Sequence, residues 1–493
     1  MGFHFSATGA LSKPRLEKMA FFCYNIGNYP PQIMETRAEN QTLDEKWYSE
    51  FEKIGSTAAV EYLKTNKAGE EEQKKKFLEN EIGNPAFSYP AIKIDDIAAK
   101  EKALLELKSK ILAEEPNEVI RKAYQWKINA KLAELRMIAC AGATANPETT
   151  PKEKAGLLHR FSRYSEFIFG APDKEVFAFS IDSLKKTAEG LESSEDPQIA
   201  RAANDFMLAL PVNKIEYTPP AEPTPELIAR VEKETLREVG KMIDLPERSE
   251  KFTAEEIKPV IEDILAALEA KGWTAVIENQ PIFSISQAKR QVKIPVKANH
   301  TRERLQALIA HEIGTHVVRR LNGERSKFKL LGLGLDRYDQ GEEGVTTIRE
   351  QSIQKKFDQN PWLERHLAIG LAAGLDGTPH DFREVFGVMQ KYHYMLSLKS
   401  GKNPAKAKVE ADQKAWDRCV RTFRGTDCKT KGVCFTKDII YAQGNIAVWD
   451  VIGKNPDELM RLSIGKYDPS NPRHLWILNQ LGITEKDLEE LQK

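Results

Sequence analysis

The chain has 493 residues, 41% of them hydrophobic and 30% charged, a composition that is typical of a soluble globular protein and excludes collagen-like, disordered and membrane-spanning classes for most of its length. Its 73 Lys and Arg residues balance 73 Asp and Glu residues, which argues against a whole-chain attraction to nucleic acid or to an anionic membrane. We therefore expect neither of these partners, and we expect roughly two to four compact units.

Cysteine usage and the N-terminus indicate the cellular compartment. The five cysteines are few and odd in number, which favours a reducing compartment over a disulfide framework. Residues 1–25 lack a continuous apolar region followed by a small-residue cleavage site, so the sequence predicts no export signal. We expect a cytoplasmic protein without a membrane-spanning helix.

The first part of the chain is predicted to be helical. Its composition between residues 41 and 140 is dense in Glu, Lys, Ala and Leu, which are good helix formers. Apolar residues recur at helical spacing, which predicts amphipathic helices. These patterns cover residues 98–112, 119–138 and, with interruptions, 155–209.

A cluster of prolines divides the chain. Pro219, Pro220, Pro223 and Pro225 lie within a few residues of one another, and such a cluster is typical of a connector. The sequence therefore predicts three parts. They are a helical N-terminal region, residues 1–210, a proline-rich connector, residues 211–225, and a C-terminal domain, residues 226–493.

Helices and short strands are predicted to alternate after the connector. Residues 225–239 and 253–271 have the pattern of amphipathic helices. Short β-branched or alternating runs then predict a small sheet, in which the last strand is expected at an edge where an extended peptide could pair with it. The predicted strands are 273–278, 282–286 and 291–296. The expected fold class is α+β, mostly helical and gluzincin-like, with the small sheet beside a metal-binding helix.

The helix that follows the sheet carries a candidate metal site. Thr301 is a plausible N-cap, and ten residues later come His311 and Glu312, followed by a second histidine, His316. The two histidines are five positions apart, which separates them by about 140° on a regular helix. Both can bind one ion only if the helix is widened locally, as in a π-bulge. Gly314 lies between the two histidines and could ease that distortion, because glycine weakens a regular helix. We do not expect packing alone to explain a glycine at this position.

Zinc in a hydrolytic site needs a third protein ligand and an open position for water. Two carboxylates, Glu342 and Glu343, follow at a suitable distance, and both precede a segment that is predicted to be helical. We take Glu343 as the third ligand, although the residues themselves leave the choice between the two open. With such a site Glu312 could act as general base and pass a proton to the leaving amine.

Four segments resemble one family of metallopeptidases. They are HEIGTHVVRRLNG (His311–Gly323), EEGVT (Glu342–Thr346), FRG with CFTKDIIYAQG (Phe423–Gly444) and FSRYSEFIFGAPDKEVF (Phe161–Phe177). Together they are similar to the HExxxH family that includes the microtubule-associated tyrosine carboxypeptidases and many bacterial relatives. The resemblance covers roughly residues 155–485. The family's usual Glu-Gly-Leu-Ala stands here as Glu343-Gly344-Val345-Thr346, which keeps the ligand.

The resemblance implies a function. It implies a zinc metallopeptidase that removes a C-terminal Tyr or Phe from a peptide or protein, with one Zn²⁺ per chain. The ligands would be His311, His316 and Glu343, and Glu312 would be the catalyst. Two alternatives stay open, an endopeptidase or aminopeptidase on the same zinc and a non-catalytic regulatory binding module. The presence of Glu312 argues against the binding module, because a binding protein has no need of a general base. It does not indicate the oligomeric state or whether a tubulin-like substrate applies.

A carboxypeptidase must also recognise the free α-carboxylate of its substrate, for which arginine and lysine are suited. The segment Phe423–Gly444 holds three polar residues among apolar ones, Arg424, Lys437 and Tyr441. Lys437 and Tyr441 are four positions apart and would share one face of a helix. We expect these three residues to bind the substrate.

Overall fold

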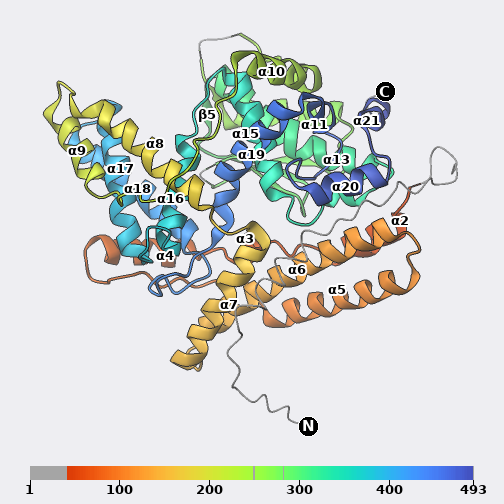
Figure 1. Ribbon diagram of the computed structural model, residues 1–493, viewed down its shortest axis with the longest axis horizontal. Helices are drawn as coiled ribbons and strands as arrows, with labels where there is room; N and C mark the ends of the chain where they lie inside the picture. Colours follow the sequence, from red (N-terminus) through yellow and green to blue (C-terminus); the bar gives the residue numbers. More distant parts are fainter. Residues whose placement is uncertain (1–41, 248–249, 281, 492–493) are drawn as a thin grey trace. The chain divides into compact units, whose positions relative to one another are not determined.

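Helices dominate the structure, a computed structural model that describes residues 42–247, 250–280 and 282–491 (Figure 1). Helices with two small sheets confirm the predicted mostly helical α+β class. The N-terminal segment on which the export prediction depends, and Cys23 with it, lies outside the described residues. The other four cysteines are buried and unpaired. None of the described helices is both long and apolar enough to cross a membrane.

The predicted N-terminal helices are present. Their starts follow capping rules, since Asn117 and Asp173 each accept hydrogen bonds from backbone N–H groups of the following turn, and Thr150 forms a capping box with Glu153. The helices are α2 (Glu45–Lys53), α3 (Ala59–Tyr62), α4 (Lys67–Leu78), α5 (Ile94–Glu114), α6 (Glu118–Thr144), α7 (Pro151–Phe169), α8 (Lys174–Glu192) and α9 (Pro197–Met207). Figure 1 shows the long helices α5 and α6 side by side.

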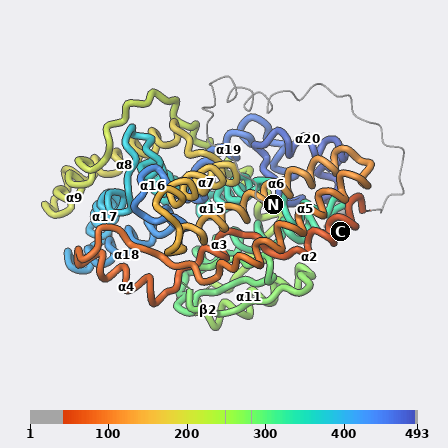
Figure 2. The backbone as a smooth tube through the Cα atoms, turned by 90° about the horizontal axis from the view of Figure 1, so that it is seen from below, coloured from red at the N-terminus to blue at the C-terminus, as the bar shows by residue number. Residues whose placement is uncertain are grey.

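The connector and the small sheet follow. Residues 211–224 form neither helix nor strand, and the chain then enters α10 (Pro225–Val239). The next elements are β1 (Phe252–Thr253), α11 (Ala254–Ala267), β2 (Thr274–Glu278), β3 (Ser284–Ser286), β4 (Gln291–Pro295) and β5 (Asn299–His300). Strands β1 and β5 pair with each other, and α11 packs against β2 at one side of the unit (Figure 2).

The order of the three-stranded sheet corrects one prediction. Strand β4 lies between β2, to which it is parallel, and β3, to which it is antiparallel. The last predicted strand is therefore central, and its backbone groups already have partners on both sides. Strand β3 is an edge strand instead, and it packs beside the helix that carries His311 and His316.

The remaining helices complete the chain. They are α12 (Arg302–His311), the π-helical η1 (Glu312–Val317), α13 (Val318–Arg325), α14 (Leu330–Leu333), α15 (Asp339–Gln354), α16 (Asn360–Ala373), α17 (Phe382–Lys399), α18 (Pro404–Thr422), the 3₁₀-helical η2 (Thr436–Asp438), α19 (Ile439–Lys454), the 3₁₀-helical η3 (Pro456–Arg461), α20 (Pro472–Gln480) and α21 (Glu485–Leu491). Helices α15 and α19 pack along each other.

Buried hydrophobic side chains of the described residues form three cores. The largest contains side chains from the N-terminal helices and from α16 to α21, among them Phe177, Trp416 and Tyr467. The second joins the small sheet and α11 to the apolar face of α12, through Val292, Leu305 and other buried side chains. The third joins α10, α15 and α19. From residue 42 onward the chain forms one compact unit. The predicted division at residue 210 stays a prediction.

Candidate metal centre

One continuous helical segment carries the two predicted histidine ligands. Thr301 caps its start by accepting a hydrogen bond from the backbone N–H of Arg304. Helix α12 then runs directly into the π-helical turn η1 and on into α13. This turn confirms the widening that the five-residue spacing predicts. It brings the imidazole ring centroids of His311 and His316 to 5.5 Å from each other.

Two side chains bind carbonyl groups of the widened turn. The Thr315 hydroxyl donates to the carbonyl of Ala310 at 3.1 Å, and Arg349 Nη1 on α15 donates to the carbonyl of Gly314 at 2.7 Å. Arg349 also donates through Nη2 to Glu238 on α10 at 2.5 Å. Because Arg349 and Glu238 are both buried, this ion pair fixes α10 and α15 against the turn.

Gly314 has a packing reason that the sequence did not reveal. A Cβ atom on Gly314 would lie 2.6 Å from Cγ1 of Val239, the fully buried last residue of α10. The expectation that packing offers no reason for this glycine was therefore wrong. The absence of a side chain lets α10 approach the metal-binding helix closely.

Replacing Gly314 by alanine tests this contact. We expect Gly314→Ala to lower the free energy of unfolding by about 1–3 kcal/mol, because the new methyl group overpacks a filled core. In a Val239→Ala background the same change should have a much smaller effect, since the space has been opened. Urea denaturation of the single and double variants measures the coupling.

The control for this experiment is Gly156→Ala in α7, where an added Cβ meets nothing within 4 Å. It should leave stability unchanged or raise it by up to about 1 kcal/mol, because alanine is the better helix former. Equal losses for Gly314→Ala in both backgrounds would show that contact with Val239 is not the reason for the glycine.

The structure brings the predicted ligands together. One nitrogen of His311, one nitrogen of His316 and one carboxylate oxygen of Glu343 all lie within 4.8 Å of one another. Glu343 comes from α15, which packs against α12 and η1. Its Oε2 is buried and has no hydrogen-bond partner among the described residues. A buried carboxylate oxygen without a donor is unfavourable unless a cation is bound to it.

His311 is oriented by a carboxylate on the side away from the triad. Its Nδ1 lies 3.0 Å from Oε2 of Glu350, which also pairs with Arg304. Burial by itself would lower the pKa of His311, but the carboxylates of Glu350, Glu312 and Glu343 outweigh it and raise the pKa to about 9. The centre therefore favours positive charge.

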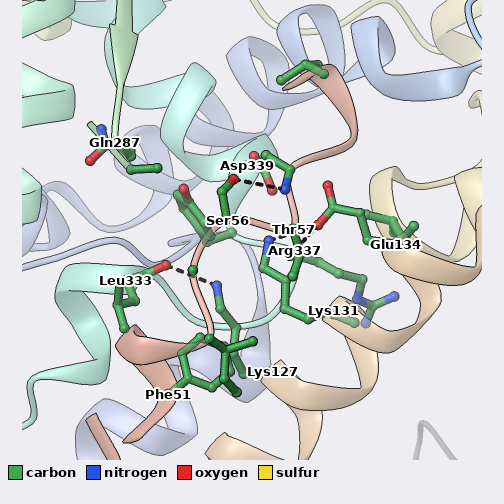
Figure 3. A pocket seen from close by; sticks show the side chains of 18 of the residues that line it. Phe51, Ser56, Thr57, Lys127, Lys131, Glu134, Gln287, Leu333, Arg337 and Asp339 are labelled. Carbon is green, nitrogen blue, oxygen red and sulfur yellow. Dashed lines mark hydrogen bonds and ion pairs between the residues drawn. The ribbon is translucent and has the colours of Figure 1, made fainter. Parts of the chain in front are cut away.

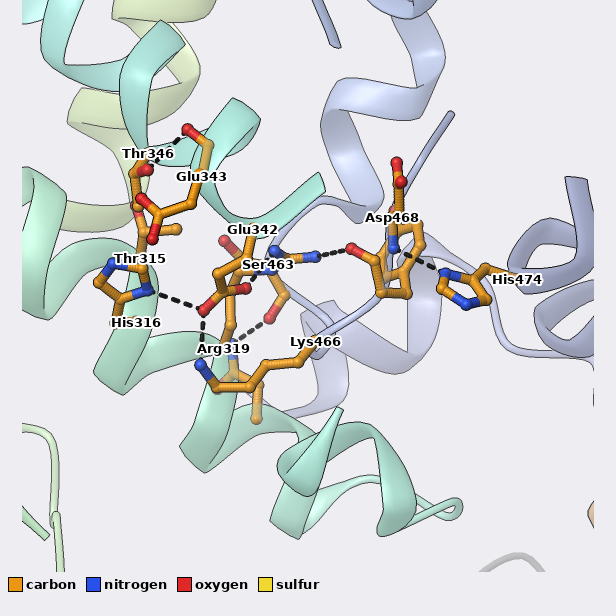
Figure 4. Close-up of polar contacts among 12 residues, drawn as sticks. Thr315, His316, Arg319, Glu342, Glu343, Thr346, Ser463, Lys466, Asp468 and His474 are labelled. Carbon is orange, nitrogen blue, oxygen red and sulfur yellow. Dashed lines mark hydrogen bonds and ion pairs between the residues drawn. The ribbon is translucent and has the colours of Figure 1, made fainter. Parts of the chain in front are cut away.

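His316 is oriented by Glu342 (Figure 4). Its Nδ1 lies 2.9 Å from Oε1 of Glu342, and the same carboxylate accepts hydrogen bonds from Arg319 Nη1 and Lys466 Nζ, each at 2.5 Å. Burial would raise the pKa of Glu342, yet Lys466, Arg319 and His316 hold it well below its usual value. Of the two adjacent glutamates, Glu342 is thus occupied by three donors and Glu343 faces the two imidazoles.

Glu312 stands at the first position of the π-helical turn. Its carboxylate is half-buried and accepts no hydrogen bond from a described residue. Glu312 follows His311 directly in the chain, and its charge is one of those that raise the pKa of this histidine. A carboxylate in this position is available to exchange a proton with a bound molecule.

The three predicted substrate-binding residues lie in two places. Tyr441 lies on α19, which packs along α15, the helix of Glu343. Burial raises the pKa of Tyr441, and the charge of Glu343 raises it further. Glu343 is also among the groups that raise the pKa of Lys437 against the effect of burial. The charged neighbours that affect Arg424 are instead Arg421, Asp438, Tyr89 and Glu70, none of which belongs to the triad.

Comparison with known proteins identifies the family. The profile of the family described as microtubule-associated tyrosine carboxypeptidase matches residues 181–394 and 403–487. The chain belongs to this family. The match includes the metal-binding helix, α15 and the segment with Lys437 and Tyr441, so the whole triad lies inside it.

Curated relatives share a short stretch with this chain. Microtubule-associated tyrosine carboxypeptidase 1 of Mus musculus is 28% identical over 153 residues, and its Homo sapiens counterpart is 29% identical over 154 residues. Each alignment covers 29% of this chain and 27% of the relative, so the chain matches only about a quarter of the length of these proteins. No solved structure matches the chain.

A cavity of about 290 Å³ has none of His311, Glu312, His316 and Glu343 in its wall, and much of this wall lies outside the part that matches the family (Figure 3). Lys437 lines it, and so does Gln287, whose Nε2 donates to the carbonyl of His316 at 3.4 Å. Lys127 of α6 donates to the carbonyl groups of Leu333 and Leu335, and burial lowers its pKa to about 7. The apolar part of the wall comprises Phe51, Ile54, Val60, Leu104, Ile168, Phe169 and Leu333.

Sequence reasoning missed the residues that orient the ligands. Glu350 follows Glu343 by seven positions on α15, a spacing of two helical turns that places both on one face and could have indicated it. No local signal points to Lys466, which is more than a hundred residues from its partner Glu342. The same holds for the cavity wall, which joins elements that are distant in sequence.

Proposed function

We propose that this protein is a zinc metallocarboxypeptidase that hydrolyses the last peptide bond of chains ending in Tyr or Phe. The observation that carries the proposal is the triad of His311, His316 and Glu343 with Glu312 beside it. Membership of the family supports a peptidase, and the names of the relatives supply the specificity for a C-terminal tyrosine. The role of Glu312 and the need for zinc are parts of the proposal.

The residues of the centre fit zinc. Two imidazole nitrogens and one carboxylate oxygen are the ligand set of many hydrolytic zinc sites, in which a further position stays open. The free Oε2 of Glu343 and the anionic surroundings of His311 both favour a cation. When bound, zinc supplies a Lewis acid that polarises a carbonyl group and makes water more acidic.

The remaining chemistry falls to side chains of the chain itself. Glu350 and Glu342 hold the Nδ1 atoms of His311 and His316, which leaves the Nε2 atoms directed at the centre. Glu312 accepts a proton from the attacking water at its carboxylate and transfers it to the nitrogen of the leaving residue. The carboxylate of Glu312 is half-buried and accepts no hydrogen bond from the described residues, so it is available for this proton transfer.

The substrate chain requires two further contacts. Lys437 and Tyr441, beside Glu343, are placed to contact the terminal residue, and Lys437 borders the cavity as well. The cavity has an apolar wall in which an aromatic side chain would be buried favourably. Among the described residues, strand β3 has no strand on its outer edge, next to η1, and the substrate backbone could add there as a further strand.

Zinc content and peptide cleavage test the proposal together. We expect one zinc per chain by elemental analysis. We also expect mass spectrometry to show release of only the last residue from peptides ending in Tyr or Phe, but not in Lys or Glu. Removal of the metal with a chelator should abolish release, and added zinc should restore it.

Modified peptides separate this proposal from the other enzymes. An amidated C-terminus should block a carboxypeptidase but not an endopeptidase, and an acetylated N-terminus should block only an aminopeptidase. Bound zinc without cleavage of any of these peptides would contradict the proposed specificity. A protein that neither binds zinc nor cleaves would leave the non-catalytic binding module as the better account.

A further inference from the structure

Positive charge exceeds negative charge in a buried cluster beside Tyr441. Asp438 of η2 accepts two hydrogen bonds from Arg421, at 2.5 and 2.7 Å, and lies 3.4 Å from Arg418. Arg418 also donates to Glu364 at 2.5 Å, and His393 lies 3.0 Å from that carboxylate. Each of the two carboxylates is thus paired with at least one arginine, Glu364 with Arg418 and Asp438 with Arg421.

Arg365 of α16 is a further cation in this cluster; the charge of Asp438 acts on it, but no carboxylate in the described part of the chain forms an ion pair with it. Its Nε is buried without a hydrogen bond, and its guanidinium lies 4.3 Å from the ring centroid of Tyr441. Stacking on a tyrosine orients a guanidinium but leaves its hydrogen-bond donors unused. A half-buried guanidinium with unused donors is suited to bind an anion.

The position of Tyr441 relates this guanidinium to the metal centre. Tyr441 stands on α19 one helical turn before Gly444, and α19 packs along α15. The two helices approach closely beside Glu343, because a Cβ on the next residue, Gly344, would lie 2.4 Å from the carbonyl oxygen of Gly444. An anion bound by Arg365 would thus sit next to the centre, on the side of Tyr441.

We infer that Arg365 is the residue that binds the free α-carboxylate of the substrate, with its guanidinium held in place by the ring of Tyr441. This inference rests on the proposed function, and it names a specificity-determining residue outside the segment that sequence reasoning singled out. A guanidinium with two parallel donors fits a carboxylate in a bidentate manner, which distinguishes a chain end from an internal peptide bond.

The neighbouring arginines are less suited to this role. Arg421 already forms a bidentate pair with Asp438, so its donors are used. Arg424 also has a buried Nε without a hydrogen bond, but the guanidinium that lies over the ring of Tyr441 among the described residues is that of Arg365. Arg365 is the arginine of this cluster that is both unpaired and adjacent to Tyr441.

Binding of a matched pair of peptides tests the inference without turnover. The probes are dansyl-Gly-Gly-Tyr with a free carboxylate and the same peptide as its C-terminal amide, measured by fluorescence anisotropy on the zinc-loaded Glu312→Gln protein. We expect the acid to bind about 10- to 100-fold more tightly than the amide, because charge-assisted hydrogen bonds are lost with the amide. Arg365→Gln should remove this preference and leave the affinity for the amide unchanged.

Two further variants serve as controls. Arg365→Lys keeps the positive charge but loses the two parallel N–H donors of the guanidinium. It should therefore keep part of the preference for the acid that Arg365→Gln loses, and it tests whether the site tolerates a change of side chain. Arg201→Gln removes an exposed arginine on α9, 85% accessible, and should have no effect. Thermal melting of each variant identifies loss of folding.

The outcomes separate this inference from the proposed function. An unchanged preference for the acid in folded Arg365→Gln overturns the inference, even if the wild-type protein cleaves peptides ending in Tyr. A preference that depends on Arg365 in a protein that cleaves none of the peptides supports the carboxylate site and contradicts the proposed function. Equal binding of acid and amide by the parent protein contradicts the carboxylate site directly.

Discussion

Replacing Glu312 by glutamine is expected to reduce kcat/KM for a peptide ending in Tyr by about 10²- to 10⁴-fold, the contribution that general acid–base catalysis usually makes. Glutamine has the same shape but cannot accept the proton of the attacking water. The triad of His311, His316 and Glu343 does not include this side chain, so zinc should stay at one per chain. Steady-state kinetics and elemental analysis on the same preparation measure both quantities.

Glu303→Gln is the matched control for this experiment, because Glu303 is an exposed glutamate in the first turn of α12. It should change neither activity nor zinc content. Full activity in Glu312→Gln would mean that another group removes the proton. Loss of zinc from Glu312→Gln would mean that this carboxylate contributes to metal binding, which the arrangement of the triad does not predict.

The sequence predicted the helix of His311 and His316 and its widened turn well, because the information for them is local. The five-residue spacing of His311 and His316 is incompatible with one ion on a regular helix, and a π-helical turn follows from that spacing alone. Capping by Thr301 and the helix boundaries after the connector are likewise local properties. Such features depend on a few neighbouring residues and hardly on the rest of the fold.

Contacts between distant segments could not be predicted in this way. The reason for Gly314 is Val239, at the end of another helix, and the order of the sheet depends on which strands meet after folding. Glu342 and Glu343 are adjacent glutamates whose side chains point about 100° apart on a helix. Which of them faces the two histidines depends on contacts that distant segments make with this helix. Arg365 became a candidate only through its contact with Tyr441.

These two adjacent glutamates should respond in opposite ways to the same substitution. In Glu342→Gln a buried carboxylate is lost, and Arg319 and Lys466, which are 0% and 2% exposed, remain without a counter-charge. Breaking a buried ionic network from one side typically costs about 3–5 kcal/mol. Loss of the partner of His316 should also weaken zinc binding by about 10- to 100-fold. We expect a protein of low stability that still binds zinc.

Glu343→Gln should instead remove zinc and leave stability nearly intact when both proteins are compared without metal. Its Oε2 has no hydrogen-bond partner among the described residues, so a neutral amide loses no ion pair and removes a repulsive charge beside Glu312 and Glu350. Urea denaturation in the presence of a chelator, together with competition for zinc against a chromogenic chelator, measures the two effects separately. If Glu342→Gln lost zinc while Glu343→Gln kept it, the assignment of ligand and supporting residue would be reversed, because only a direct ligand is indispensable to the metal.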